Sequence, residues 1–218
     1  MKSLDLDDKR VAVCMPLQTV QYSHVDYHPT SEQMMAVRNK LGLPESYILI
    51  AGDADTMHDH GVILHAIFSL PLSLGVVVYT RRTTHSEVLL KMVRDSAAAD
   101  RVQFVYEITE LDLCSLYRMA LLMIYMPSVE SSVMPIVGAL HQGVPMILSD
   151  TPTNREAAGG AAMFVPPHDQ EAIAHAIKSV VYSESFRGQL IAQCWAEAKR
   201  YSQENIAEQL AKIYESAW

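Results

Sequence analysis

Residues able to bind a phosphorylated ligand gather in one stretch of the chain, between two short apolar runs at 121–126 and 144–149. Glu130, Ser131 and Ser132 follow the first run, and Pro135 comes three residues later. Serine hydroxyls often cap helix N-termini and proline suits a first helical turn, so we expect a helix to begin here. The N–H groups at its start favour a phosphate. The carboxylate of Glu130 can then accept hydrogen bonds from a neutral hydroxylated group beside that phosphate.

The spacing of apolar residues indicates the helix itself. Val133, Ile136, Val137 and Leu140 recur at the i, i+3, i+4, i+7 positions of one buried helix face, and Gly143 separates them from the next apolar run. The whole stretch therefore predicts a strand–loop–helix–strand unit. Such a unit places the loop and the helix N-terminus at the carboxyl end of a parallel sheet, where open α/β sheets bind ligands.

Two other polar segments follow apolar runs of strand type. The segment at 53–61 contains donor atoms suited to a divalent metal, or else an Asp-rich helix cap beside solvated histidines; the residues concerned are Asp53, Asp55, His58 and His60. Of these two interpretations we expect the second, with no bound metal. Arg81 and Arg82 follow the run at 75–80, and are either phosphate contacts or a solvated surface pair. His141 and His168 show no partner in the sequence and are interpreted as ordinary helix and loop histidines.

Composition excludes several classes of function. Half of the 218 residues are hydrophobic and 19% are charged, which predicts a packed core. A net charge of −8 argues against general affinity for nucleic acid or for an anionic membrane. No apolar run is long enough to span a membrane, and Cys14, Cys114 and Cys194 lack metal-binding spacing, so we expect buried thiols in a soluble cytoplasmic protein. The sequence contains no nucleophile triad, dinucleotide-binding or P-loop pattern.

Strand and helix patterns alternate along the chain. Apolar runs of strand type occur at 11–17, 47–52, 75–80, 101–106, 121–126 and 144–149. Helical patterns lie at 31–43, with Ser31 as its expected N-cap, at about 59–69, and at 85–97, 111–120, 169–183, 184–200 and 202–216. This alternation predicts an α/β fold with a doubly wound parallel sheet and C-terminal helices. We expect one Rossmann-like domain over residues 1–218.

The central stretch resembles the donor-site motif of glycosyltransferase family 4, whose members have the two-domain GT-B fold. The matching positions are Pro127, Ser128, Glu130, Pro135, Ala139, Gly143 and Pro145, with one residue fewer before the glutamate than in the family. The segments 40–52, 101–120 and 149–177 are similar to the family in order and spacing. The resemblance implies that this chain is the C-terminal, nucleotide-sugar-binding half of such a fold.

The resemblance also implies roles for individual residues. Glu130 would contact hydroxyls of the donor sugar, and the backbone N–H groups of Ser131, Ser132 and Val133 would receive the diphosphate. Gly52 matches the glycine after the family's entry strand. Glu107 and Ile108 match the place where the family's backbone reads the nucleobase edge.

Two positions depart from the family pattern. The second glutamate of the family's Glu-x7-Glu, which holds the ribose, falls on Gly138. An Arg-Lys pair that neutralises the diphosphate falls on Met57 and His58, so that His58, with Arg81 and Arg82, is left as a possible phosphate contact. No catalytic residue can be assigned.

The resemblance implies a domain that binds a nucleotide sugar, GDP-mannose or a UDP-hexose, for retaining transfer to an acceptor. The acceptor, a glycan, lipid or protein, would be held by an N-terminal domain or a partner chain, so this domain alone would be inactive and would need no cofactor beyond its substrate. The alternative, favoured by Gly138 and Met57, is a degenerate module that no longer catalyses and acts as an interaction partner.

Overall fold

The structure is a computed structural model, and it describes residues 27–52, 59–71, 73–127 and 132–216. Its strands form one sheet in the order β3-β2-β1-β4-β5-β6, and all five pairings are parallel. The strands are β1 (Tyr47–Ala51), β2 (Gly75–Tyr79), β3 (Val102–Val105), β4 (Leu122–Tyr125), β5 (Met146–Ser149) and β6 (Ala162–Val165). This order confirms the predicted Rossmann-like α/β fold. The strand expected at 11–17 and Cys14 lie outside the described residues.

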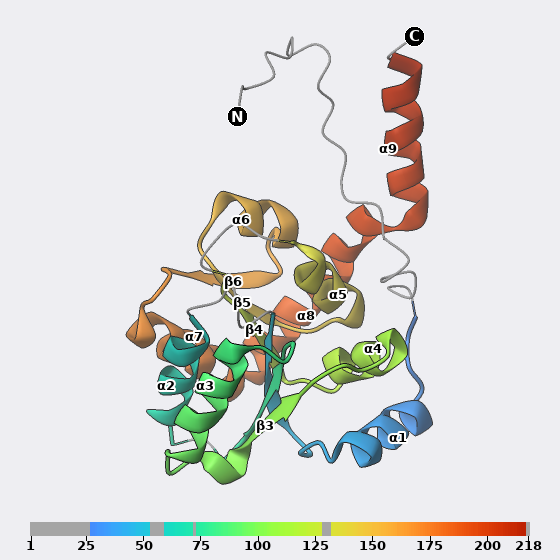
Figure 1. The fold of residues 1–218 in the computed structure, drawn as a ribbon. Coiled ribbons are helices and arrows are strands. Elements are labelled where there is room, and N and C mark those ends of the chain that lie inside the picture. Colours follow the sequence, from blue (N-terminus) through green and yellow to red (C-terminus); the bar gives the residue numbers. More distant parts are fainter. Residues whose placement is uncertain (1–26, 53–58, 72, 128–131, 217–218) are drawn as a thin grey trace.

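Helices cover both faces of the sheet (Figure 1). One face packs against α1 (Ser31–Leu41), α4 (Glu110–Arg118), α5 (Met134–Gln142), α6 (Pro152–Ala158) and α8 (Glu184–Ala198). The other face packs against α2 (Asp59–Phe68), α3 (Thr84–Arg94) and α7 (Gln170–Tyr182). Successive strand residues point to opposite faces, so Leu49 belongs to the first core and Ile50 to the second. Because both faces are buried, the strands are continuous apolar runs in the sequence.

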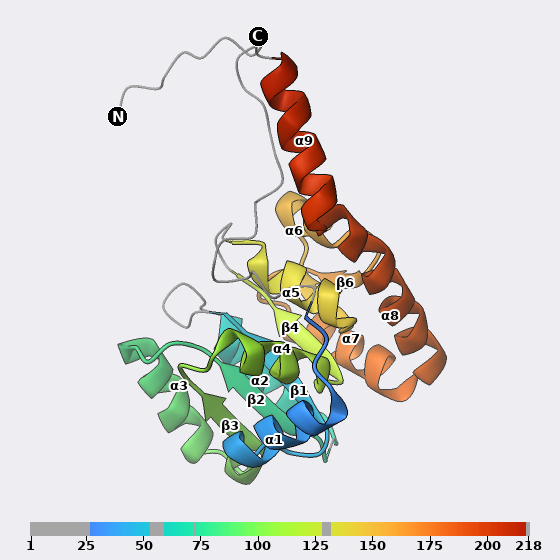
Figure 2. The same ribbon diagram turned by 90° about the vertical axis from the view of Figure 1, so that its right-hand side faces the viewer.

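The last helix, α9 (Gln203–Ser216), leaves the body of the domain, as both ribbon views show (Figures 1 and 2). Tyr201 precedes it and is buried, and its hydroxyl donates a hydrogen bond to the Ala157 carbonyl at 2.9 Å. Tyr201 therefore packs the end of α8 and the turn before α9 against α6. Among the described helices, none is long and apolar enough to cross a membrane.

Several element boundaries differ from the sequence prediction. The N-cap of α1 is Thr30 rather than Ser31, because the Thr30 hydroxyl accepts from the Gln33 N–H while the Gln33 side chain accepts from the Thr30 N–H. Gly42 ends α1 with φ 66°, in the left-handed region that glycine adopts readily. Helix α6 and strand β6 had no counterpart in the sequence prediction. Both are short, and an Ala/Gly-rich segment carries little periodicity.

Two of the three cysteines lie in the described part of the chain. Cys194 is buried in α8, and burial raises the pKa of its thiol to about 12. Cys114 is half-buried in α4, and burial raises its thiol pKa to about 11. Both are free thiols held in the neutral form, which agrees with the structural role expected from the sequence.

Candidate functional site

The sheet has one topological switch point, between β1 and β4. The chain runs outward from β1 to β2 and β3, then returns to the other side of β1 for β4, β5 and β6. The connections after β1 and β4 therefore leave the sheet toward opposite faces, to α2 and α5 respectively. A crevice outside the carboxyl ends of the strands forms at such a point, and open α/β sheets bind ligands there.

The N-terminus of α5 borders this crevice. The Tyr125 hydroxyl, at the end of β4, donates a hydrogen bond to the Ser132 carbonyl at 2.8 Å. The Ser132 hydroxyl accepts from the Met134 N–H at 3.2 Å. The N-cap is Val133, whose own side chain makes no capping bond, so the expectation of a serine at that position is wrong for Ser132. Pro135 lies in the first turn, as predicted.

The structure thus places Ser132 and Val133 where the sequence predicted, at the start of a helix at the carboxyl edge. Ser128, Glu130 and Ser131 lie outside the described residues, so the predicted acid of the loop is not located. Asp53, Asp55, Met57 and His58 lie outside as well. His60 of the same segment is buried in α2, so the expectation of a solvated histidine is wrong there. Gly52 directly follows β1 with φ 120°, a backbone conformation that favours glycine.

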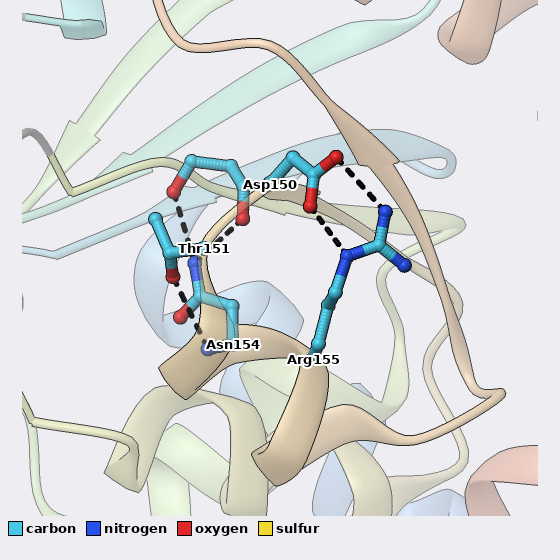
Figure 3. A network of polar contacts seen from close by, with 5 residues as sticks. Asp150, Thr151, Asn154 and Arg155 are labelled. Carbon is cyan, nitrogen blue, oxygen red and sulfur yellow. Dashed lines mark hydrogen bonds and ion pairs between the residues drawn. The ribbon is translucent and has the colours of Figure 1, made fainter.

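A buried polar network fixes the neighbouring carboxyl end, that of β5 (Figure 3). The Asn154 amide, buried at the start of α6, donates to the Ser149 carbonyl and to its hydroxyl, each at 2.9 Å. The Ser149 hydroxyl contacts the carbonyl of Pro127 at 3.5 Å. Through this hydroxyl, the end of β5 supports Pro127, the second residue of the connection that leads from β4 to α5. The sequence analysis did not identify Asn154 as part of the site.

An exposed ion pair lies beside this network. Arg155 donates to both oxygens of Asp150, at 2.5 and 2.9 Å (Figure 3). The Arg155 guanidinium also lies over the Phe164 ring, 4.6 Å from its centre. The hydrogen bonds from Arg155 hold the pKa of the Asp150 carboxyl below its ordinary value. Because both charges are already engaged, this arginine is a poor candidate for a ligand contact.

The carboxyl ends of β2 and β3 carry the other predicted residues. Arg81 and Arg82 are exposed after β2, and the Arg82 guanidinium lies 4.4 Å from the centre of the Tyr106 ring. Glu107 follows Tyr106 with a left-handed backbone, φ 45°. The next residue, Ile108, packs against the same core as Val133. The loop after β3 and the start of α5 therefore lie on the same face of the sheet.

The third polar feature at this edge joins α2 to the loop after β6. Asp59 is fully buried at the first position of α2, and its carboxylate pairs with Nδ1 of His168. The interpretation of His168 as an unpartnered loop histidine is therefore wrong. Residues 109 positions apart share no local pattern, so no spacing in the sequence indicates this pair. His141 is a buried helix residue of α5.

Residues 39–194 match the model of the family described as glycosyl transferases group 1, which is well over half of the chain. The chain belongs to this family.

Relatives among known proteins include two O-antigen mannosyltransferases. The O-antigen chain mannosyltransferase B of Escherichia coli is 26% identical over 195 residues, which cover 87% of this chain and 51% of that protein. The O-antigen chain mannosyltransferase RfbU of Salmonella typhimurium is 26% identical over 185 residues, covering 77% and 51%. The chain therefore spans about half the length of the curated relatives it matches.

Solved structures show the same fold. Sucrose-phosphate synthase from Thermosynechococcus elongatus superposes with a TM-score of 0.77 at 21% identity, over 93% of this chain and 51% of that one. Anabaena HepE, solved in complex with UDP and glucose, gives 0.76 at 15% identity, over 88% and 54%. At these identities the likeness establishes the GT-B-type domain fold alone.

Within this group 1 glycosyltransferase domain, Gly138 lies on the face of α5 that meets α4. A Cβ atom built on Gly138 would lie 3.4 Å from Cε2 of Tyr117, a slightly tight but ordinary contact. Helix α5 contains no acidic residue. The position that carries the second glutamate in the family pattern is therefore a glycine packed beside an aromatic ring.

Proposed function

We propose that this domain binds a nucleotide sugar and presents it for glycosyl transfer. The observation that carries the proposal is the start of α5, which lies at the switch point of the sheet in a chain of the group 1 family. Backbone N–H groups at a helix N-terminus bind phosphate irrespective of side-chain identity. Because the side chain does not take part in this contact, a serine-rich loop can bind phosphate where other sequences have glycine.

The diphosphate is assigned to the backbone of Ser132 and Val133. The Tyr125 hydroxyl fixes the Ser132 carbonyl, and the Ser149 hydroxyl supports Pro127, so both ends of the connection after β4 are held by side chains of the sheet. A preorganised anion site loses little entropy when the ligand binds. We assign the donor sugar to Glu130, within the same connection.

The nucleoside is assigned to the loop after β3, with Glu107 and Ile108 at the base. This loop and the start of α5 lie on the same face of the sheet, and α4 packs against α5. A nucleotide whose phosphates lie at α5 would therefore extend along α4 toward Ile108. Arg81 and Arg82, at the next strand end, are positioned to neutralise charge at the edge of the site.

The reaction we propose is retaining transfer of a hexose from GDP-mannose or a UDP-hexose. The mannosyl group is suggested by the two O-antigen relatives, and the UDP alternative by HepE. The acceptor is assigned to a second domain or chain, since this chain spans only half the length of those relatives. Catalysis would then depend on positioning and on stabilisation of the departing phosphate.

Isothermal titration calorimetry with GDP, UDP and their hexose conjugates tests the proposal. Val133 has φ −78°, which proline can adopt, so Val133→Pro removes one N–H with little strain, and Val133→Ala is its matched control. We expect Val133→Pro to weaken diphosphate binding about tenfold and Val133→Ala to leave it unchanged. Glu130→Ala should weaken a nucleotide sugar more than the bare nucleotide. Absence of binding by the unmodified chain at millimolar nucleotide would refute the donor site.

The second candidate is a non-catalytic glycosyltransferase-like module that acts as an interaction partner. Gly138 favours it, because the family's ribose-binding acid is missing from α5. The two candidate functions differ in whether the donor site binds a nucleotide. A module that has lost catalysis and donor binding gives no calorimetric signal with any nucleotide, whereas a donor-binding domain does.

A further inference from the structure

Asp59 and His168 form a polar pair at the carboxyl edge of the sheet. The Asp59 side chain has no solvent exposure, whereas the His168 side chain is 59% exposed. The contact uses Nδ1 of the imidazole. A buried carboxylate therefore lies behind an exposed ring, whose other nitrogen, Nε2, is the one left for a further contact.

The topology places this pair beside the crevice. Strand β6 lies at the edge of the sheet, and strands β5 and β4 lie between it and β1. Helix α2 follows β1 in the chain. His168 follows β6, yet it reaches the first residue of α2. Helices α7 and α2 pack against each other on the same face of the sheet, so the loop before α7 and the first residue of α2 meet at the carboxyl edge. The connection from β4 to α5 starts from this same edge.

The backbone holds His168 in place. The loop contains Pro166 and Pro167, and the Asp169 N–H donates to the Pro166 carbonyl at 3.4 Å. The Asp169 side chain then caps α7 by accepting from the Ala172 N–H at 2.9 Å. His168 itself has φ 61°, in the left-handed region that non-glycine residues rarely adopt. Such conformations cluster at functional sites.

The positively charged side chains near the carboxyl edge of the sheet leave a phosphate contact open to His168. Arg155 is engaged by Asp150, and Arg81 and Arg82 lie at the end of β2, on the other side of β1 from β6. A doubly protonated imidazole that donates Nδ1–H to a carboxylate can donate Nε2–H to a phosphate oxygen, as a charge-assisted hydrogen bond. The Asp59 carboxylate behind the ring fixes its orientation, as a carboxylate does for a histidine in other functional sites.

We propose that His168, held by Asp59, binds the terminal phosphate of a nucleoside diphosphate in the crevice. Asp59 acts as a positioning residue. The proposal rests on the proposed donor-binding function, and it adds a phosphate contact from the far side of the sheet, from the loop after β6.

The test compares the affinities for nucleoside diphosphates and monophosphates by isothermal titration calorimetry. The probes are GDP with GMP, and UDP with UMP. His168→Gln should weaken the diphosphate about tenfold and the monophosphate by less than about twofold, because only the diphosphate reaches the ring. Asp59→Asn should give an intermediate loss, since an amide oxygen can still accept from Nδ1–H. His175→Gln, at an exposed position of α7, is the matched control and should change neither affinity.

The outcomes separate this proposal from the function on which it rests. If the unmodified chain binds no nucleotide, both fail. If it binds diphosphate and His168→Gln keeps the same ratio of diphosphate to monophosphate affinity, the phosphate contact is refuted while the donor site stands. An equal loss for both ligands would show a merely structural role for His168, and would also refute the contact. His168 is exposed, so its substitution can be made without opening the core.

Discussion

The side-chain amide of Asn154 donates two hydrogen bonds to Ser149, one to the carbonyl and one to the hydroxyl, each 2.9 Å long. This contact joins the end of β5 to the start of α6, and the Ser149 hydroxyl continues it to the Pro127 carbonyl at the end of β4. The same small network therefore stabilises the domain and supports the connection that leads to the proposed phosphate site.

Replacement of Asn154 by alanine should destabilise the domain by about 1–3 kcal/mol, because it leaves buried acceptors of Ser149 without their donor. Urea denaturation followed by circular dichroism measures this change. Glu156→Gln, at an exposed position of the same helix, should have almost no effect. An Asn154→Ala variant as stable as the unmodified chain would contradict the importance of the network.

Two glycines should respond in opposite directions to alanine. Gly143 ends α5 with φ 64°, and a Cβ atom there would lie 2.5 Å from the Trp195 ring, so Gly143→Ala should cost about 1–3 kcal/mol. Gly188 lies within α8 with no atom within 4 Å of a Cβ atom, so Gly188→Ala should stabilise by about 0.5–1 kcal/mol. Thermal melts of both variants measure the difference. Similar shifts of both melting temperatures in one direction would be inconsistent with this geometry.

The ion pair between Lys40 and Asp112 links α1 to α4 at 2.7 Å. Burial raises the pKa of the Asp112 carboxyl, but hydrogen bonds from Lys40 and Thr109 lower it more, so that it lies below its ordinary value. A depressed carboxyl pKa stabilises the fold above the unfolded-state value, and this contribution is lost as the pH falls through the folded-state value.

Lys40→Met should therefore lower stability at pH 7 by less than about 1 kcal/mol, since Lys40 is mostly exposed. The difference from the unmodified chain should disappear as the pH falls through the lowered folded-state pKa of Asp112. Denaturation at a series of pH values tests this expectation. A difference that persists unchanged in acid would show that the methionine acts through packing instead.

Gly138→Glu should strengthen nucleotide binding if the ribose lies along α5. The Cβ atom requires a shift of only a few tenths of an ångström by Tyr117, and a carboxylate could then accept hydrogen bonds from the ribose hydroxyls. Hydrogen bonds to a charged group contribute about 1.5–3 kcal/mol, which is a gain of tenfold or more in affinity. The isosteric Gly138→Gln is the control and should give a smaller gain. Calorimetry that shows no gain for Gly138→Glu would place the ribose elsewhere.

The sequence by itself determined the class of fold, and it predicted where a ligand site would lie. Continuous apolar runs such as 47–51 predict strands buried on both faces, and the glycines at 42 and 143 mark helix ends with a left-handed backbone. These features are local, because each depends on residues a few positions apart. The family motif likewise lies in one continuous stretch.

Only the tertiary structure decided which distant side chains meet. Asp59 and His168 are brought together because α2 and α7, which begin at these two residues' segments, pack side by side on one face of the sheet. Strand β6 itself has only four residues, three of them half-buried, and takes its place by pairing with β5. Such contacts depend on the order of the strands and on the packing of α7 against α2. No spacing within the sequence encodes them, since the energy that selects them comes from burial and pairing across the whole sheet.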